Sequence, residues 1–326
     1  MKEFLEKLLV DGKVKNIAVK VGIGDIVIDE CYLSSEESIN EYTLFDMASV
    51  TKILATTSLI FIALDRGLIS LDDKASSFFN CEDRGITIRH LLTHTTGVGH
   101  RNLCLPNYNY DNIAERILSM PFEIPVGTDV IYSCPAFIVL GKISEKLLGD
   151  RLDRLFNNLV AKPLEMNRTS FLPLRRDNIV NSNPEESGRG KVNDYNCSFL
   201  GGVAGNAGVF SCMADMTGFA HMLLNKGGNI YSDKVFNLAK KNYTANMSES
   251  RGLGFLYVDK RYKQTGDLFP EGAIGHCGHT GQSVFVDTDS GLYVIILSDA
   301  TRYTSDYDTV MKMREEIHNE IRKAIK

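Results

Sequence analysis

The sequence lacks the dense lysine and arginine patches that mark nucleic-acid and membrane-surface proteins. Its basic clusters do not exceed pairs such as Lys240-Lys241, and its 326 residues carry a net charge of -5. These properties argue against nucleic acid or an anionic membrane as the main partner, since both reward concentrated positive charge. No uninterrupted run of about 18 apolar residues is present, so we expect no membrane-spanning helix.

We also expect neither an export signal nor a disulfide framework. The first ten residues mix leucine with glutamate and lysine, which is typical of a short amphipathic helix and not of an apolar signal core. The seven cysteines are odd in number and irregularly spaced, a pattern that fits reduced thiols better than paired ones. We therefore expect a cytoplasmic protein.

The chain is long enough, and with 44% hydrophobic residues apolar enough, to fill a substantial core. β-Branched runs at residues 17–21 and 26–28 flank Gly22-Ile23-Gly24-Asp25, which predicts a hairpin. Residues 54–64 are apolar on every side and predict a helix buried within the core.

Helical patterns dominate the middle of the chain, and strand patterns return near its end. Helices are expected over residues 112–120, 135–148, 152–160 and 310–325, and strands over 254–258, 283–287 and 292–297. This order predicts one catalytic domain with an α/β lobe built from about residues 1–65 and 210–326, and a mainly helical lobe over about 66–209. No internal repeat is present.

The most informative stretch is Ser49-Val50-Thr51-Lys52. Residues three apart lie on the same face of a helix, so a helix starting near Ala48 would bring the Lys52 amine close to the Ser49 hydroxyl. The unpaired N–H groups of a first helical turn also favour the negative charge that acyl transfer generates. This spacing predicts a serine hydrolase, although a short motif alone also occurs by chance.

Further sequence motifs follow along the chain, and together they argue against a chance match of the Ser49–Lys52 motif. They are FDMASVTK at 45–52, GLISLDD at 67–73, ITIRHLLTHTTG at 86–97, YS at 132–133, PLEM at 163–166, GGVAGNAGVFS at 201–211 and GHCGHTG at 275–281. The sequence thus resembles the serine β-lactamase and penicillin-binding-protein superfamily, in particular its class C β-lactamase and esterase branch. The resemblance covers roughly residues 43–299. It implies an α/β fold with an antiparallel sheet flanked by helices plus a helical lobe, and chemistry that needs neither cofactor nor metal.

The resemblance assigns roles by position. Ser49 becomes the nucleophile, Lys52 its proton partner and Tyr132 a proton relay, while the backbone N–H groups of Ser49 and His279 form the oxyanion hole. In lactam-binding relatives the motif that begins at Tyr132 often ends in asparagine, whereas here it ends in Cys134. A thiol cannot copy an amide's donor and acceptor pair, which favours ester or other acyl substrates over β-lactams.

The third motif can be placed at His276-Cys277-Gly278 or at His279-Thr280-Gly281, and we favour the first. Gly278 would then let substrate lie against the backbone. His276 and His279 should diverge on a strand, which argues against the alternative of a zinc site. Asn206, in the glycine-rich run, is a further candidate for substrate binding, although a structural loop is an alternative there. For His94 we expect a structural role.

These observations predict a serine hydrolase that forms an acyl-enzyme on Ser49, and they favour an esterase acting on small acyl substrates. One alternative keeps the fold and changes the substrate to a β-lactam or a D-amino-acid peptide. The other is a ligand-binding module without turnover, which the presence of Ser49, Lys52 and Tyr132 together argues against. The sequence does not indicate an oligomeric state.

Overall fold

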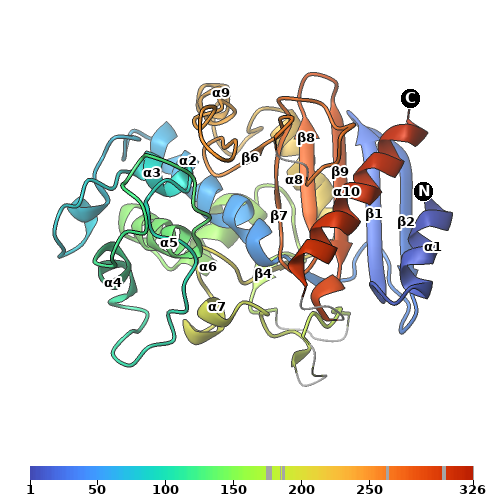
Figure 1. The fold of residues 1–326 in the computed structure, drawn as a ribbon, viewed down its shortest axis with the longest axis horizontal. Helices are drawn as coiled ribbons and strands as arrows, with labels where there is room; N and C mark the ends of the chain where they lie inside the picture. The colour runs from blue at the N-terminus through green and yellow to red at the C-terminus, as the bar shows by residue number, and fades with distance from the viewer. Residues whose placement is uncertain (174–177, 184, 186–187, 262–263, 303–305, 326) are drawn as a thin grey trace.

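The computed structural model describes residues 1–173, 178–183, 185, 188–261, 264–302 and 306–325. Its centre is a six-stranded antiparallel sheet in the order β2-β1-β9-β8-β7-β6. The strands span β1 Asn16–Ile23, β2 Ile26–Ser34, β6 Leu256–Tyr257, β7 Ile274–Cys277, β8 Ser283–Asp287 and β9 Leu292–Ser298. Strands from both ends of the sequence therefore pair directly, through β1 and β9 (Figure 1).

Each face of this sheet is covered by helices, and strand alternation divides the core between the two faces. Val294 and Ile296 of β9 belong to the core cluster shared with α1 (Lys2–Val10) and α10 (Tyr307–Ala324). Ile295 and Leu297 point the other way, into the large core that includes α8 (Met213–Leu224). Figure 1 shows α10 running along the sheet, with α1 beside β2.

The helical part of the molecule packs around one apolar segment. This segment begins as a 3₁₀ turn at Ala48–Val50, continues as a π-helical turn at Lys52–Thr57 and ends as α2, Ser58–Asp65. The other helices here are α3 Ile88–Leu92, α4 Ile113–Leu118, α5 Cys134–Leu148 and α6 Leu152–Phe156, with a 3₁₀ turn at Ala75–Phe78 and a π-helical turn at Asn157–Ala161. The buried helix predicted over residues 54–64 is confirmed.

A second, three-stranded sheet connects the two parts in the order β3-β5-β4. Its strands are β3 Phe45–Asp46, β4 Ser170–Phe171 and β5 Val209–Ser211. The remaining elements are α7 Tyr195–Phe199, α9 Asp233–Ala239 and a 3₁₀ turn at Ala300–Arg302. The short strand β3 is important for function because it ends two residues before Ala48.

The segment Ala48–Asp65 bears on the expectation that the chain has no membrane-spanning helix. By length and mean hydropathy it is apolar enough to cross a membrane, despite the lysine within it. However, 83% of the segment is buried inside the fold, which is the usual environment of a core helix in a compact domain. The apolar character is explained by packing against neighbouring helices.

Candidate active site

Ser49 lies in a sharp turn between β3 and the core helix. Ala48, immediately before it, has a φ of 44°, a left-handed conformation that costs a non-glycine residue roughly 1–2 kcal/mol. The buried Asp46 carboxylate offsets this cost by accepting hydrogen bonds from the N–H of Ala48 at 2.8 Å and of Asn193 at 2.7 Å. Burial raises the Asp46 pKa to about 6, against the lowering effect of those two hydrogen bonds. Asp46 thus fixes the backbone that presents the serine.

Lys52 is fully buried and its amine reaches the serine as the spacing predicts. Its Nζ lies 2.9 Å from Ser49 Oγ, 3.0 Å from the carbonyl oxygen of Asn206 and 3.3 Å from Cys134 Sγ. The helix is wider here than expected, since Lys52 begins a π-helical turn, and such turns recur at functional sites. Three partners on three different segments hold the amine in one place.

Tyr132 reaches Ser49 from a different segment of the chain, just before α5. Its hydroxyl donates a hydrogen bond of 2.8 Å to Ser49 Oγ, and Lys52 Nζ lies 5.0 Å from the centre of its ring. Burial holds the pKa of Tyr132 well above its ordinary value, although the hydrogen bond to Ser49 and the charge of Arg251 both oppose that shift. The serine oxygen is therefore in hydrogen-bond contact with both predicted proton carriers.

His94 supports this arrangement and does not contact Ser49. Its ring lies 4.8 Å from that of Tyr132 and 5.0 Å from that of Phe137, and its Nδ1 accepts the N–H of Ser133 at 2.9 Å. Burial, together with the charges of Arg251 and Lys52, holds the His94 pKa well below its ordinary value. A neutral imidazole locked in this way positions Tyr132, consistent with the structural role expected from the sequence.

The two histidines of the third motif do not diverge as expected. Strand β7 ends at Cys277, so the alternation of side chains does not extend to His279, and both His276 and His279 line the same cleft. The His276 pKa is held well below its ordinary value by burial and by Lys52 and Arg251. His279 stacks on Tyr307 at 5.2 Å. Its backbone N–H, like that of Ser49, makes no hydrogen bond within the described residues, as an oxyanion hole requires.

The structural reason for a glycine at position 278 differs from the one predicted. A Cβ there would lie 2.9 Å from the carbonyl oxygen of Met47, so the space beside Gly278 is filled by the backbone that precedes Ser49. Gly278 is not among the residues that line the cleft. The glycine thus allows β7 to pack closely against the serine turn, and the prediction that it makes room for substrate is wrong.

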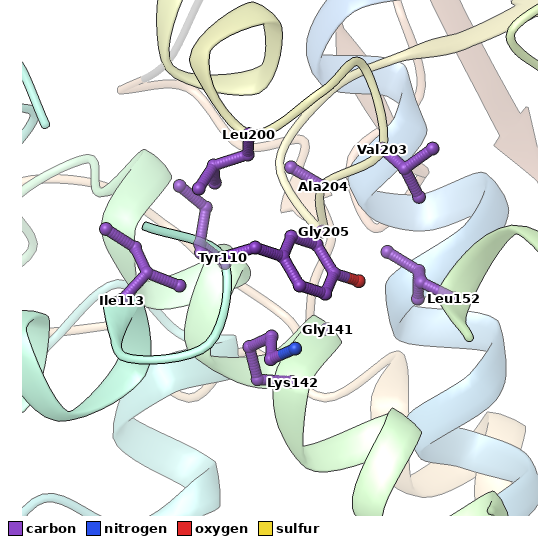
Figure 2. Close-up of a pocket in the computed structure, with 10 residues that line it drawn as sticks. Tyr110, Ile113, Gly141, Lys142, Leu152, Leu200, Val203, Ala204 and Gly205 are labelled. Carbon is purple, nitrogen blue, oxygen red and sulfur yellow. The ribbon is translucent and has the colours of Figure 1, made fainter. Parts of the chain in front are cut away.

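Asn206 also acts otherwise than predicted, because its backbone carbonyl, and not its side chain, faces the reacting groups. The side chain is fully buried and its amide atoms have no hydrogen-bond partner within the described residues. The preceding loop is close-packed: a Cβ on Gly205 would collide with the carbonyl oxygen of Phe137 on α5. Figure 2 shows Gly205 against Gly141 of α5, around a hollow of about 10 Å³ that has no room for a substrate.

A cleft of about 660 Å³ opens over Ser49, and it contains charged residues that the sequence motifs did not reveal. Arg251 is 2% exposed, forms an ion pair with Glu249 and has its Cζ 5.7 Å from the ring centre of Tyr132. Its Nε and Nη1 have no hydrogen-bond partner within the described part of the chain. His100, at another edge, hydrogen-bonds Tyr195 at 2.9 Å. Both residues come from loops distant in sequence from Ser49.

Within the described residues no group of three or more His, Cys, Asp or Glu side chains converges, so the alternative of a zinc site, which the sequence argued against, has no ligand set there. The reacting groups that do converge are a hydroxyl, an amine and a phenol around one serine oxygen. This set can exchange protons with a serine during nucleophilic attack.

Comparison with known proteins agrees with this chemistry. The family model described as Beta-lactamase matches residues 8–313. The chain belongs to the beta-lactamase family. It is therefore a serine hydrolase of that family, as the motifs predicted. A candidate D-alanyl-D-alanine carboxypeptidase of Escherichia coli K12 is 28% identical over an alignment covering 79% of this chain and 69% of the relative.

Solved structures share the fold across nearly the whole chain. EstCE1, a hydrolase with promiscuous acyltransferase activity, matches with a TM-score of 0.77 at 18% identity and covers 96% of this chain and 97% of its own. Simvastatin synthase (LovD) from Aspergillus terreus matches with 0.72 at 18% identity, covering 99% and 98%. An octameric penicillin-binding protein homologue from Pyrococcus abyssi matches with 0.76 at 19% identity, covering 97% and 76%. The predicted α/β fold is thereby confirmed.

Proposed function

We propose that this beta-lactamase family member is an esterase-like hydrolase that forms an acyl-enzyme on Ser49 with small acyl substrates. The observation that carries the proposal is the contact of Ser49 Oγ with both Lys52 Nζ at 2.9 Å and the Tyr132 hydroxyl at 2.8 Å. Ser49 attacks the substrate carbonyl, and its proton passes to the Lys52 and Tyr132 pair. The N–H groups of Ser49 and His279 stabilise the oxyanion. Tyr132 then protonates the leaving group, and water releases the acyl chain.

The preference for esters rests on Cys134. Its thiol lies beside Lys52 in the place where an amide would otherwise meet a lactam's amide carbonyl. Losing one hydrogen bond costs about 0.5–1.5 kcal/mol, and leaving a buried polar group of the substrate unsatisfied costs up to about 3 kcal/mol. These values correspond to a preference of about ten- to a hundredfold for esters over β-lactams.

A second candidate is hydrolysis of a peptide that ends in a D-amino acid, and Arg251 favours it. Two of its guanidinium nitrogens have no partner among the described residues, and the side chain lines the cleft beside Tyr132. A guanidinium in this state suits a terminal carboxylate, because charge-assisted hydrogen bonds between these groups are strong. The relative from Escherichia coli, named for such an activity, adds support.

Covalent labelling and turnover test both candidates. A fluorophosphonate should add once to the wild-type protein and not to Ser49→Ala, and kcat should fall by about 10³-fold or more in that variant. Aryl acetate and butyrate esters, nitrocefin and D-alanyl-D-alanine peptides are then compared by kcat/KM. Labelling that persists in Ser49→Ala would overturn the assignment of the nucleophile. A kcat/KM for nitrocefin or the peptide above that for the esters would overturn the esterase preference.

A further inference from the structure

The Cys134 thiol is a second nucleophilic atom in the cleft, and the hydrolytic mechanism above does not use it. Cys134 lines the cleft together with Ser49 and Tyr132. Its Sγ is 3.3 Å from Lys52 Nζ, and His100 lines the same cleft. The amine of Lys52 is thus shared between a serine oxygen and a cysteine sulfur.

Three features around Sγ favour the thiolate over the thiol. The first two are the Lys52 amine and the His100 imidazole. The third is the start of α5, a 15-residue helix whose first residue is Cys134 and whose N-cap side chain, Ser133, accepts the N–H of Ala136 at 3.1 Å. The positive end of a helix lowers the pKa of a cysteine placed there.

The balance of charges around the thiol agrees with this geometry. Burial alone raises the pKa of Cys134, but the charge of Lys52 and the interaction with His100 outweigh burial and the opposing Asp194, and the pKa lies below its ordinary value. The same interaction raises the pKa of His100. Cys134 differs in this from the five cysteines whose pKa is raised, with burial as the main cause: Cys31, Cys81, Cys197, Cys212 and Cys277.

The surroundings of the thiol are those of a ligand site. His276 lines the same cleft, is 2% exposed, and its Nε2 has no hydrogen-bond partner within the described residues. A buried polar atom of this kind calls for a partner, which a bound ligand in the cleft can supply. With about 660 Å³ available, the cleft admits a small organic molecule to both Ser49 and Cys134.

We propose that Cys134 is a second covalent site of this cleft, a thiolate held by Lys52 and His100 that reacts with soft carbon electrophiles such as α,β-unsaturated carbonyl compounds and haloacetamides. With an unsaturated carbonyl, Sγ bonds to the β-carbon and the electron pair of the C=C bond moves to form the enolate. The His100 imidazolium then returns a proton to the α-carbon. With a haloacetamide, the C–S bond forms as the halide leaves.

The adduct has a predictable effect on hydrolysis. A thioether at Cys134 occupies the space beside Lys52 and removes the negative charge that faces its amine. Soft electrophiles therefore inactivate an enzyme whose acyl chemistry takes place on the neighbouring serine.

Iodoacetamide tests this proposal in the folded chain. The rate of carbamidomethylation at each cysteine is followed by peptide mass spectrometry between pH 5 and pH 10, with the exposed Cys104 as a reference within the same molecule. We expect Cys134 to react at pH 7 at least about tenfold faster than Cys104 and to show a lower midpoint of its pH profile. Lys52→Met and His100→Gln should each move that midpoint upward. Lys142→Met, which removes another amine on α5 that pairs with Glu145, should not.

The same measurement in Ser49→Ala separates this proposal from the proposed function, because thiol alkylation does not need the serine. A Cys134 that stays unmodified in the folded protein, or that reacts with a midpoint at or above that of Cys104, would overturn the proposal. So would a midpoint that Lys52→Met leaves unchanged. These results would leave fluorophosphonate labelling of Ser49 unaffected. Circular dichroism of each variant identifies any that fails to fold, and the wild-type and Ser49→Ala profiles remain decisive in that case.

Discussion

The substitution Asp46→Asn tests two effects of the carboxylate that holds the turn before Ser49: its contribution to catalysis and its effect on the stability of the fold. In the wild-type protein the two carboxylate oxygens accept one N–H each, from Ala48 and from Asn193. An amide has only one acceptor oxygen, so one of the two N–H groups loses its partner. The constraint on Ala48, whose φ is 44°, then weakens, and Ser49 is less well positioned. We expect kcat/KM for an aryl ester to fall by about ten- to a hundredfold, as for other small displacements of a reacting group.

The effect on stability has a definite sign and depends on pH. Burial moves the Asp46 pKa from its ordinary value of 3.8 to about 6. Between about pH 4 and pH 6 the folded protein therefore keeps a proton that the unfolded chain has released, and the folded state loses stability as the pH rises through this window. A displacement of this size corresponds to about 3 kcal/mol. This direction is opposite to that of a carboxylate stabilised by a salt bridge.

Urea unfolding at pH 4 and pH 7 measures the pH-dependent contribution of Asp46 to the free energy of unfolding. The amide of Asp46→Asn does not titrate, while every other group is common to both proteins and cancels in the comparison. The free energy of unfolding of the variant, relative to wild type, should thus improve by about 2 kcal/mol between pH 4 and pH 7, whatever its absolute value, because the unfolded carboxyl is already partly ionised at pH 4. An equal pH dependence of the two proteins would refute the reasoning, since Asp46 would then titrate normally in the folded state.

Three further substitutions test the proton carriers and the thiol. Lys52→Arg should lower kcat nearly as much as Lys52→Ala, because a guanidinium stays charged and cannot accept a proton; near-normal turnover would mean that Lys52 acts only as a fixed charge. Tyr132→Phe should lower kcat by roughly 10²- to 10⁴-fold with little change in thermal stability, and an unchanged kcat would remove Tyr132 from the proton relay. Cys134→Asn should narrow the preference for aryl esters over nitrocefin in kcat/KM, and a wider gap would contradict the explanation based on the missing amide.

Elements with strong local patterns were predictable from the sequence. The strand β8 has the predicted bounds, residues 283–287, and the hairpin of β1 and β2 forms around Gly24 with its φ of 56°. Glycine and β-branched residues encode such elements through local sterics. The contact of Lys52 with Ser49 belongs to the same class, because it depends only on a spacing of three residues.

Residues whose role depends on distant contacts were not predictable. Asp46 binds the N–H of Asn193, which is 147 residues away in the sequence. Arg251 and His100 reach the cleft from loops with no motif of their own. Asn206 was identified by its neighbourhood, but its carbonyl, not its amide, contacts Lys52. Periodicity and short motifs contain no information on such pairings, which only the packed fold creates.

The distribution of charge around Tyr132 follows from these distant contacts. In this chain a histidine, His276, stands at the head of the third motif, and its pKa is held well below its ordinary value, as is that of His94. Two neutral imidazoles therefore face the site. The positive charge near the phenol comes instead from Lys52 and from Arg251, whose charge lowers the Tyr132 pKa against the effect of burial. A phenolate that forms while Tyr132 passes its proton to the leaving group is stabilised by these two groups, and the guanidinium of Arg251 stays charged at a pH where a histidine would lose its proton.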